Sequence, residues 1–149
     1  MIVKLEACTT ATTPEIIIRY AELTPEVERI HALLQALDKT IRCRVGNEEK
    51  LVNITDVYYF ESVDKKTYIY CETAVYQTES RIYQLAQDLE PMGFVQISKA
   101  FIINTNMLDS IKPLLNSRIE ATLKNGEKVY VTRKYLANIR RVLQGGGTA

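Results

Sequence analysis

Short runs of β-branched and aromatic residues, separated by turn signals, dominate the chain from residue 40 to residue 131. Such residues suit pleated strands, and short runs bounded by Gly, Asn or Asp predict strands joined by tight turns. Asn125-Gly126 is the clearest hairpin signal, and another turn is expected at Gly46-Asn47. The pattern predicts a mainly β fold with strands over Thr40–Val45, Glu49–Asn53, Val57–Glu61, Thr67–Cys71, Phe94–Ile97, Phe101–Asn104, Met107–Lys112, Arg118–Leu123 and Val129–Val131.

Three segments instead repeat apolar residues at helical spacing, which predicts small helices. One is expected to begin at Pro25 with Thr24 as its cap, because proline at the first helical position loses no hydrogen bond. A second is expected over Thr78–Glu90, before a proline and a glycine that end it. A third is expected over Arg133–Leu143, capped by Thr132.

The first 39 residues are predicted to be a separate N-terminal β-α element. Met1–Ala7 alternates weakly and Glu15–Tyr20 is strand-like, and the helix from Pro25 follows them. We therefore divide the chain into an extension over 1–39 for dimerisation or partner contact, a domain over 40–144, and a disordered tail over 145–149.

Composition excludes several classes of protein. The 149 residues are enough for one domain with a sizeable core. No run of about 18 apolar residues predicts a membrane span, and no signal peptide opens the chain, so a cytoplasmic location is expected. Three scattered cysteines and one histidine argue against a disulfide scaffold or a zinc site.

Catalytic patterns are also missing from the sequence. There is no glycine-rich phosphate loop, no Gly-x-Ser-x-Gly, no His-Glu-x-x-His, and no second histidine to pair with the first. We therefore expect a protein without enzymatic activity, cofactor, bound metal or small-molecule substrate.

Positive charge is concentrated in the last third of the chain. Residues 1–93 carry 10 basic and 15 acidic residues, whereas residues 94–149 carry 9 basic and 3 acidic ones. This asymmetry fits either a local anionic partner or a solvated lysine-rich surface. Three short polar loops stand out, each at a strand end: Lys65-Lys66-Thr67, Ser98-Lys99 and Arg133-Lys134.

The third loop places positive charges where a helix disfavours them. Arg133 and Lys134 occupy the first turn of a predicted helix, where the positive end of the helix dipole disfavours cations. An anion docked at that helix start would offset the cost, because free N–H groups and two cations meet there. If the fold brings the three loops to one edge, they would bind phosphates, and some would reach base edges.

Three ordered motifs resemble a known family of DNA-binding domains. The segment Phe94-Val95-Gln96-Ile97-Ser98-Lys99-Ala100-Phe101-Ile102-Ile103-Asn104 resembles the F-x-R-I-H-R-S-Y-I-V-N core of the LytTR (LytR/AlgR-type) domain. Ile54–Glu61 with Tyr68 precedes it at the family spacing, and Leu123–Gly126 leading to Val131–Tyr135 follows it. The resemblance covers about residues 40–143.

The resemblance implies an elongated antiparallel β fold and transcription regulation through loops inserted into successive major grooves of double-stranded DNA. Contacts in such domains come from three loops, which places them by position at Lys66, Thr67, Ser98, Lys99, Arg133 and Lys134. These are the loops that the charge pattern selects. Two departures are visible, because Gln96 replaces the family arginine and Ser98-Lys99 replaces His-Arg. Lysine lacks the bidentate fork of arginine, so these departures bear on sequence preference.

The resemblance also suggests the domain composition, partner and oligomeric state of the protein. Many such regulators are response regulators with an N-terminal receiver domain, which the first 40 residues are too few to form. The chain thus resembles stand-alone members, some of which pair with a small inhibitory membrane protein. A homodimer or paired monomers reading two similar half-sites is the arrangement we expect.

Two other functions remain open from the sequence. The chain would be a protein-interaction module if residues 1–39 bind another protein and the basic loops are merely solvated. It would bind single-stranded nucleic acid if the aromatic strand residues stack on bases: Tyr58, Tyr59, Phe60, Tyr68 and Tyr70.

Overall fold

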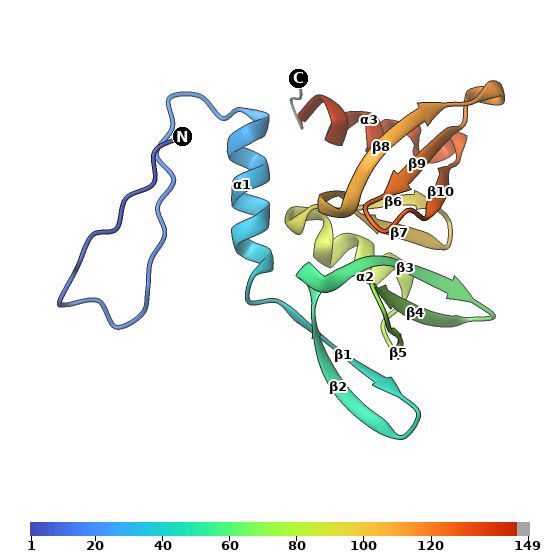
Figure 1. Cartoon of the computed structure of the whole chain (residues 1–149), viewed down its shortest axis with the longest axis horizontal. Coiled ribbons are helices and arrows are strands. Elements are labelled where there is room, and N and C mark those ends of the chain that lie inside the picture. The colour runs from blue at the N-terminus through green and yellow to red at the C-terminus, as the bar shows by residue number, and fades with distance from the viewer. Residues whose placement is uncertain (146–149) are drawn as a thin grey trace.

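Two antiparallel sheets form the body of the protein, as Figure 1 shows for the computed structural model, which describes residues 1–145. The strands are β1 Thr40–Val45, β2 Glu48–Asn53, β3 Val57–Val63, β4 Lys66–Cys71, β5 Val75–Thr78, β6 Phe94–Ser98, β7 Phe101–Asn104, β8 Leu108–Pro113, β9 Ile119–Leu123 and β10 Lys128–Val131. The larger sheet has the order β2-β1-β5-β4-β3-β7-β6, and the smaller has the order β10-β9-β8. The predicted mainly β fold with small helices is confirmed.

Three α-helices complete the described fold: α1 Pro25–Ala36, α2 Ile82–Leu89 and α3 Leu136–Gly145. Five single-turn 3-10 helices link strands and helices: η1 Ile54–Asp56, η2 Glu90–Met92, η3 Thr105–Met107, η4 Leu115–Ser117 and η5 Arg133–Tyr135. The cap predicted for α1 is present, because the Val27 N–H donates to the Thr24 hydroxyl at 3.3 Å with proline at the start of the helix. Helix α1 packs against η2 and α3.

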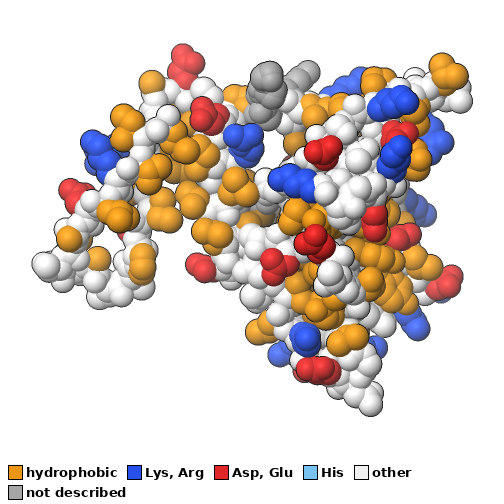
Figure 2. Space-filling view, viewed as in Figure 1, with side chains coloured by type: hydrophobic (Ala, Val, Ile, Leu, Met, Phe, Trp, Pro, Cys, Tyr) orange, Lys and Arg blue, Asp and Glu red, His pale blue; other side chains and the backbone are white. Residues whose placement is uncertain are grey.

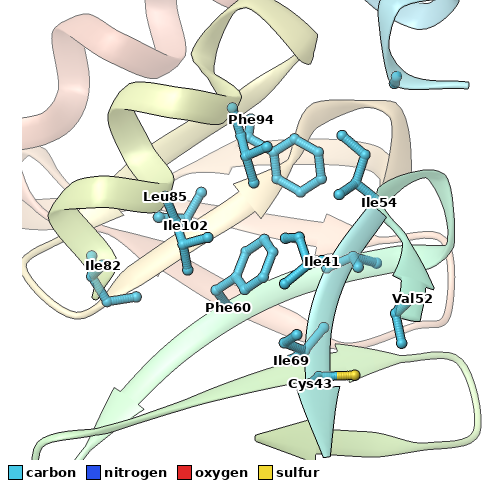
Figure 3. Close-up of a cluster of buried hydrophobic side chains, with 13 residues drawn as sticks. Ile41, Cys43, Val52, Ile54, Phe60, Ile69, Ile82, Leu85, Phe94 and Ile102 are labelled. Carbon is cyan, nitrogen blue, oxygen red and sulfur yellow. The ribbon is translucent and has the colours of Figure 1, made fainter. Parts of the chain in front are cut away.

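The first core lies between one face of the large sheet and helix α2 (Figure 3). Phe60 and Phe94 meet at its centre with ring centroids 5.7 Å apart, and Ile102 packs beside them at 0% exposure. Leu85 and Leu89 supply the buried face of α2. The remaining buried side chains come mainly from the N-terminal half of the large sheet: Ala36, Ile41, Cys43, Val52, Ile54, Val57, Ile69 and Ile82.

The second core lies on the opposite face of β3, β7 and β6, under the small sheet and α3. Tyr59, Val95 and Ile103 are neighbours in sequence of Phe60, Phe94 and Ile102, and they point the other way because side chains alternate along a strand. The other buried members are Tyr58, Ile97, Ile119, Ala121, Leu123, Val129, Val131, Leu136 and Ile139.

Four local predictions differ from the structure. No strand forms before α1, so the strands predicted over Met1–Ala7 and Glu15–Tyr20 are wrong: neither segment has a neighbouring strand in the described chain to pair with. Helix α2 begins four residues later than predicted, because Thr78 ends the unpredicted strand β5 and its hydroxyl donates to the Arg42 carbonyl at 3.1 Å. The third helix begins as the 3-10 turn η5, and Thr132 makes no side-chain cap there.

Most of the predicted tail lies outside the described residues. Gly145 ends α3, and residues 146–149 are not described. The predicted turns at Gly46-Asn47 and Asn125-Gly126 are both present, with positive φ at Gly46 and Gly126.

Gly93 connects η2 to β6, and a substitution there tests how tightly this junction is packed. Its φ is +91°, and a Cβ there would lie 3.3 Å from both Asn106 Nδ2 and Thr105 Oγ1. The Thr105 hydroxyl donates to the Gly93 carbonyl at 2.6 Å, so it is not free to move away. Gly126 has a nearly equal φ of +89° but open space around it.

We therefore expect Gly93→Ala to lower the free energy of unfolding more than Gly126→Ala does. Left-handed strain alone should cost each variant about 1–2 kcal/mol, and crowding should add about 1 kcal/mol or more at Gly93. Urea unfolding of both variants measures the difference. Equal losses would show that the crowding around Gly93 is relieved without cost.

Candidate nucleic-acid interface

The three loops selected from the sequence lie side by side at one end of the large sheet. The Ser62 N–H donates to the Ala100 carbonyl at 2.8 Å, which joins the end of β3 to the β6–β7 turn. The Thr132 N–H donates to the Ile97 carbonyl at 3.0 Å, which joins the start of η5 to the end of β6. This end of the sheet is on the right in Figure 1. The convergence of the loops is thus fixed by backbone hydrogen bonds.

The first loop is a two-residue hairpin turn between β3 and β4. Asp64 and Lys65 have φ of 51° and 67°, and Val63 pairs with Lys66 across the turn. Two positive φ angles match the right-handed twist of the flanking strands. Lys65 and Lys66 are exposed, whereas Thr67 is 3% exposed and faces the interior. The structure therefore brings Lys66 to this surface and leaves the Thr67 side chain away from it.

The second loop is the turn between β6 and β7. Lys99 is exposed at its tip, and Ser98 is half-buried beside a bulge in the pairing of the two strands. Gln96, which stands where the family has arginine, donates from Nε2 to the Lys99 carbonyl at 3.3 Å. The glutamine amide thus supports the turn, and the Lys99 side chain is the charge that the loop presents.

The third loop is the junction between β10 and α3. Arg133 and Lys134 are both exposed in η5. The Thr132 hydroxyl lies 3.4 Å from the Ile97 carbonyl, and Asn138 donates from Nδ2 to the Gln96 carbonyl at 3.2 Å. These contacts hold the junction and the start of α3 against β6. The two cations are consequently fixed beside the turn that carries Lys99.

We call the exposed cations of these three loops the basic edge: Lys65, Lys66, Lys99, Arg133 and Lys134. Arg81 adds to it, because its Nη1 donates to the Lys65 carbonyl at 3.3 Å. Figure 2 shows Lys and Arg side chains recurring along this side of the body. The sequence pattern missed Arg81, since its nearness to Lys65 depends on how β5 returns the chain to α2.

The aromatic residues of β3 and β4 are mostly packed against other aromatic residues. The Tyr59 ring stacks on Tyr70 and on Phe101, with centroids 4.3 Å and 4.6 Å away. Tyr58, Tyr59 and Phe60 are at most 7% exposed. Burial, with smaller contributions from nearby carboxylates, raises the pKa of the Tyr59 hydroxyl. Both faces of the Tyr59 ring are therefore covered, whereas Tyr68 and Tyr70 are half-buried. Because most of these rings pack into the protein, the arrangement does not favour single-strand stacking.

The model of the LytTr DNA-binding domain family matches residues 47–144. The chain belongs to the LytTR family. This match includes all three loops of the basic edge, the small sheet, α2 and every strand of the large sheet except β1. A solved structure, the LytTr DNA-binding domain of a putative methyl-accepting/DNA response regulator from Bacillus cereus, is similar at 25% identity with a TM-score of 0.67. That similarity covers 71% of this chain and 97% of the other.

Several sensory transduction proteins and uncharacterized transcriptional regulators are similar in sequence to this LytTR protein. The sensory transduction protein LytT of Bacillus cereus is 32% identical over 63% of this chain and 38% of its own length. LytT of Bacillus anthracis is 29% identical over 85% of this chain and 47% of its own length. The chain thus matches less than half the length of these relatives. An uncharacterized HTH-type transcriptional regulator of Staphylococcus aureus is 26% identical over 79% and 74% of the two chains.

Metal-ligand clusters, membrane-spanning helices and disulfides are absent from the described part of this LytTR chain. Among residues 1–145, no group of three or more His, Cys, Asp or Glu side chains is placed to hold a metal ion. No helix in that range is both long and apolar enough to cross a membrane. The cysteines are free thiols, with Cys8 exposed, Cys43 buried and Cys71 half-buried.

The three cysteines should differ in reactivity. Hydrogen bonding to Thr10 lowers the pKa of the Cys8 thiol, whereas burial raises the pKa of Cys43. Burial, aided by the Asp56 carboxylate, raises the pKa of Cys71 to about 11. Because the thiolate is the reactive form, Cys8 should be alkylated first near neutral pH, and Cys71 should stay protonated until strongly alkaline pH.

Timed iodoacetamide labelling with peptide mass spectrometry measures this order. In urea the three thiols should react at similar rates, which serves as the control. Labelling of native Cys71 as fast as Cys8 would contradict the burial described here.

Proposed function

We propose that this protein is a non-enzymatic transcriptional regulator that binds double-stranded DNA through the basic edge. The single observation that carries the proposal is the hydrogen-bonded convergence of three exposed basic loops at one end of a LytTR domain. The names of the relatives, which include an HTH-type transcriptional regulator, support it. A positively charged edge of this kind neutralises phosphates along one face of a duplex.

Insertion of the loops into successive major grooves is the mode of binding that we propose. Lys66, Lys99, Arg133 and Lys134 would anchor phosphates, and a subset of them would reach base edges. Their support is exposure combined with a fixed backbone, because each loop is held by hydrogen bonds to a neighbouring strand or loop. Ser98 is half-buried at the β6–β7 turn and would act as a secondary contact. We leave Thr67 out, because its side chain is buried.

The oligomeric state, the cellular location and the partners of the protein are also proposals. Two copies would read two similar half-sites, and regulation of transcription would place the protein in the cytoplasm. An inhibitory membrane protein as partner, and a response-regulator role, stay predictions from the family resemblance.

Duplex binding should depend steeply on salt. Four to six phosphate contacts correspond to a slope of log affinity against log salt concentration of about −4 to −5. For the Lys99→Ala/Arg133→Ala/Lys134→Ala variant we expect a slope shallower by about 2 to 3, because three counterion-releasing contacts are gone. Fluorescence anisotropy measures both slopes, using a duplex selected from a random pool, a scrambled duplex and a single strand.

The matched control removes the same amount of charge elsewhere. Arg29→Ala/Lys39→Ala/Lys50→Ala alters three exposed cations outside the basic edge, and it should leave the slope near that of the wild type. Equal weakening by both triple variants would contradict a localised interface. Wild-type affinity for any duplex no better than about 10–100 µM, or preference for the single strand, would overturn the proposal.

Lys99→Ala alone separates base reading from phosphate anchoring. If Lys99 contacts a base, we expect a loss of about 1–3 kcal/mol on the selected duplex and a smaller loss on the scrambled one. The melting temperature should change little, since the side chain is exposed at a turn. Equal losses on both duplexes would assign Lys99 to a phosphate.

A further inference from the structure

The N-terminal arm, residues 1–23, has strand-like sequence but no strand partner. It extends away from the body on the side opposite the basic edge, in an open loop (Figure 1). Within residues 1–145, the only backbone–backbone hydrogen bond made by the arm before Thr24 is the turn from the Ala11 N–H to the Cys8 carbonyl. The backbone donors and acceptors of Glu15–Arg19 are therefore open to another chain, as they are on the edge of a sheet.

Residues 14–20 make only a loose contact with their own chain. Ile16, Ile18 and Tyr20 are among the residues that line a groove with α1 and β8. Ile16 and Ile17 are nevertheless almost equally exposed, at 66% and 64%, and only Ile18 is half-buried in this segment. Most of its side-chain surface and its backbone edges are thus unpartnered.

The charge pattern of this segment is self-complementary. The sequence Glu15-Ile16-Ile17-Ile18-Arg19 carries opposite charges at its two ends and three isoleucines between them. In an antiparallel pair of two such segments centred on Ile17, each Glu15 lies opposite an Arg19. The isoleucines meet one another across the strand pair. Directly opposite residues in an antiparallel pair are close enough for ion pairs and apolar contacts to stabilise the pairing.

We propose that two copies of this chain dimerise by antiparallel pairing of Glu15–Arg19 about a two-fold axis at Ile17. The occupant of the open edge is the second copy, because an identical segment in the antiparallel direction presents the reversed charges in the matching register. The pairing is isologous, because both copies contribute the same segment to one two-fold contact. The exposed apolar residues at the start of the arm, Ile2, Val3 and Leu5, add surface that a second copy would cover.

This inference deepens the proposal that two copies act together, and it does not depend on DNA binding. Sedimentation velocity of the full chain without DNA tests it, so its failure is distinguishable from failure to bind a duplex. Glu15→Arg and Arg19→Glu each place like charges opposite one another at two positions. Each should weaken dimerisation by about tenfold or more.

Two further samples test the register in which Glu15 lies opposite Arg19 of the second copy. The double variant Glu15→Arg/Arg19→Glu restores opposite charges and should dimerise like the wild type. A mixture of the two single variants should form a heterodimer more tightly than either forms a homodimer. Glu48→Arg, a charge reversal at the exposed first residue of β2, is the control and should leave dimerisation unchanged.

These measurements can either establish or overturn the pairing of the two arms. Loss in both single variants with recovery in the double variant and the mixture would establish the pairing. A wild-type chain that stays monomeric at every concentration measured would overturn it. Single variants that dimerise as tightly as the wild type, or a double variant that does not recover, would also overturn it. Circular dichroism checks that each variant keeps the fold, which the exposed arm does not support.

Discussion

The strip formed by β3, β7 and β6 is buried on both faces, and the two cores of the protein are built on it. Phe60, Ile102 and Phe94 enter one core, while their sequence neighbours Tyr59, Ile103 and Val95 enter the other. A strand buried on both sides cannot alternate apolar with polar residues, which explains the near-continuous apolar runs in these three segments. Because both cores hold the same strip, the register of its strands is fixed, and the β3–β4 and β6–β7 turns end together at one edge.

The basic edge follows from that register rather than from any single motif. Ser62 and Thr132 donate backbone N–H groups to Ala100 and Ile97. In the described part of the chain, the turns thus flank one another without a side-chain ion pair between them. The exposed cations are therefore not neutralised by the contacts that position them. At the β6–β7 turn, different residues provide the support and the charge. The Gln96 amide hydrogen-bonds to the Lys99 carbonyl, and the exposed Lys99 side chain carries the positive charge. Lysine is a compact point charge, which suits phosphate anchoring better than bidentate base reading.

Local sequence predicted the elements whose stabilising contacts are also local. Turn chemistry predicted the Asn125-Gly126 turn, capping predicted the Thr24-Pro25 start of α1, and apolar runs predicted the strands of the LytTR core other than β5. The start of α2 was misjudged because Thr78 bonds to Arg42, which is 36 residues away. Burial of Thr67 depends on the alternation of β4 in a sheet whose faces the sequence did not reveal. Arg81 joined the basic edge through a contact with Lys65 that only the tertiary fold creates.

The N-terminal arm has a further consequence for how such a protein would respond to its own abundance. A segment that completes its hydrogen bonds only with a second molecule stays solvated in a dilute population and becomes ordered as copies accumulate. Occupancy of a paired target would then rise with the square of the copy number at low expression, and more gently once most chains are paired. If two copies pair through this arm, its strand-forming sequence without an intramolecular neighbour would make target occupancy depend on a threshold in gene dosage.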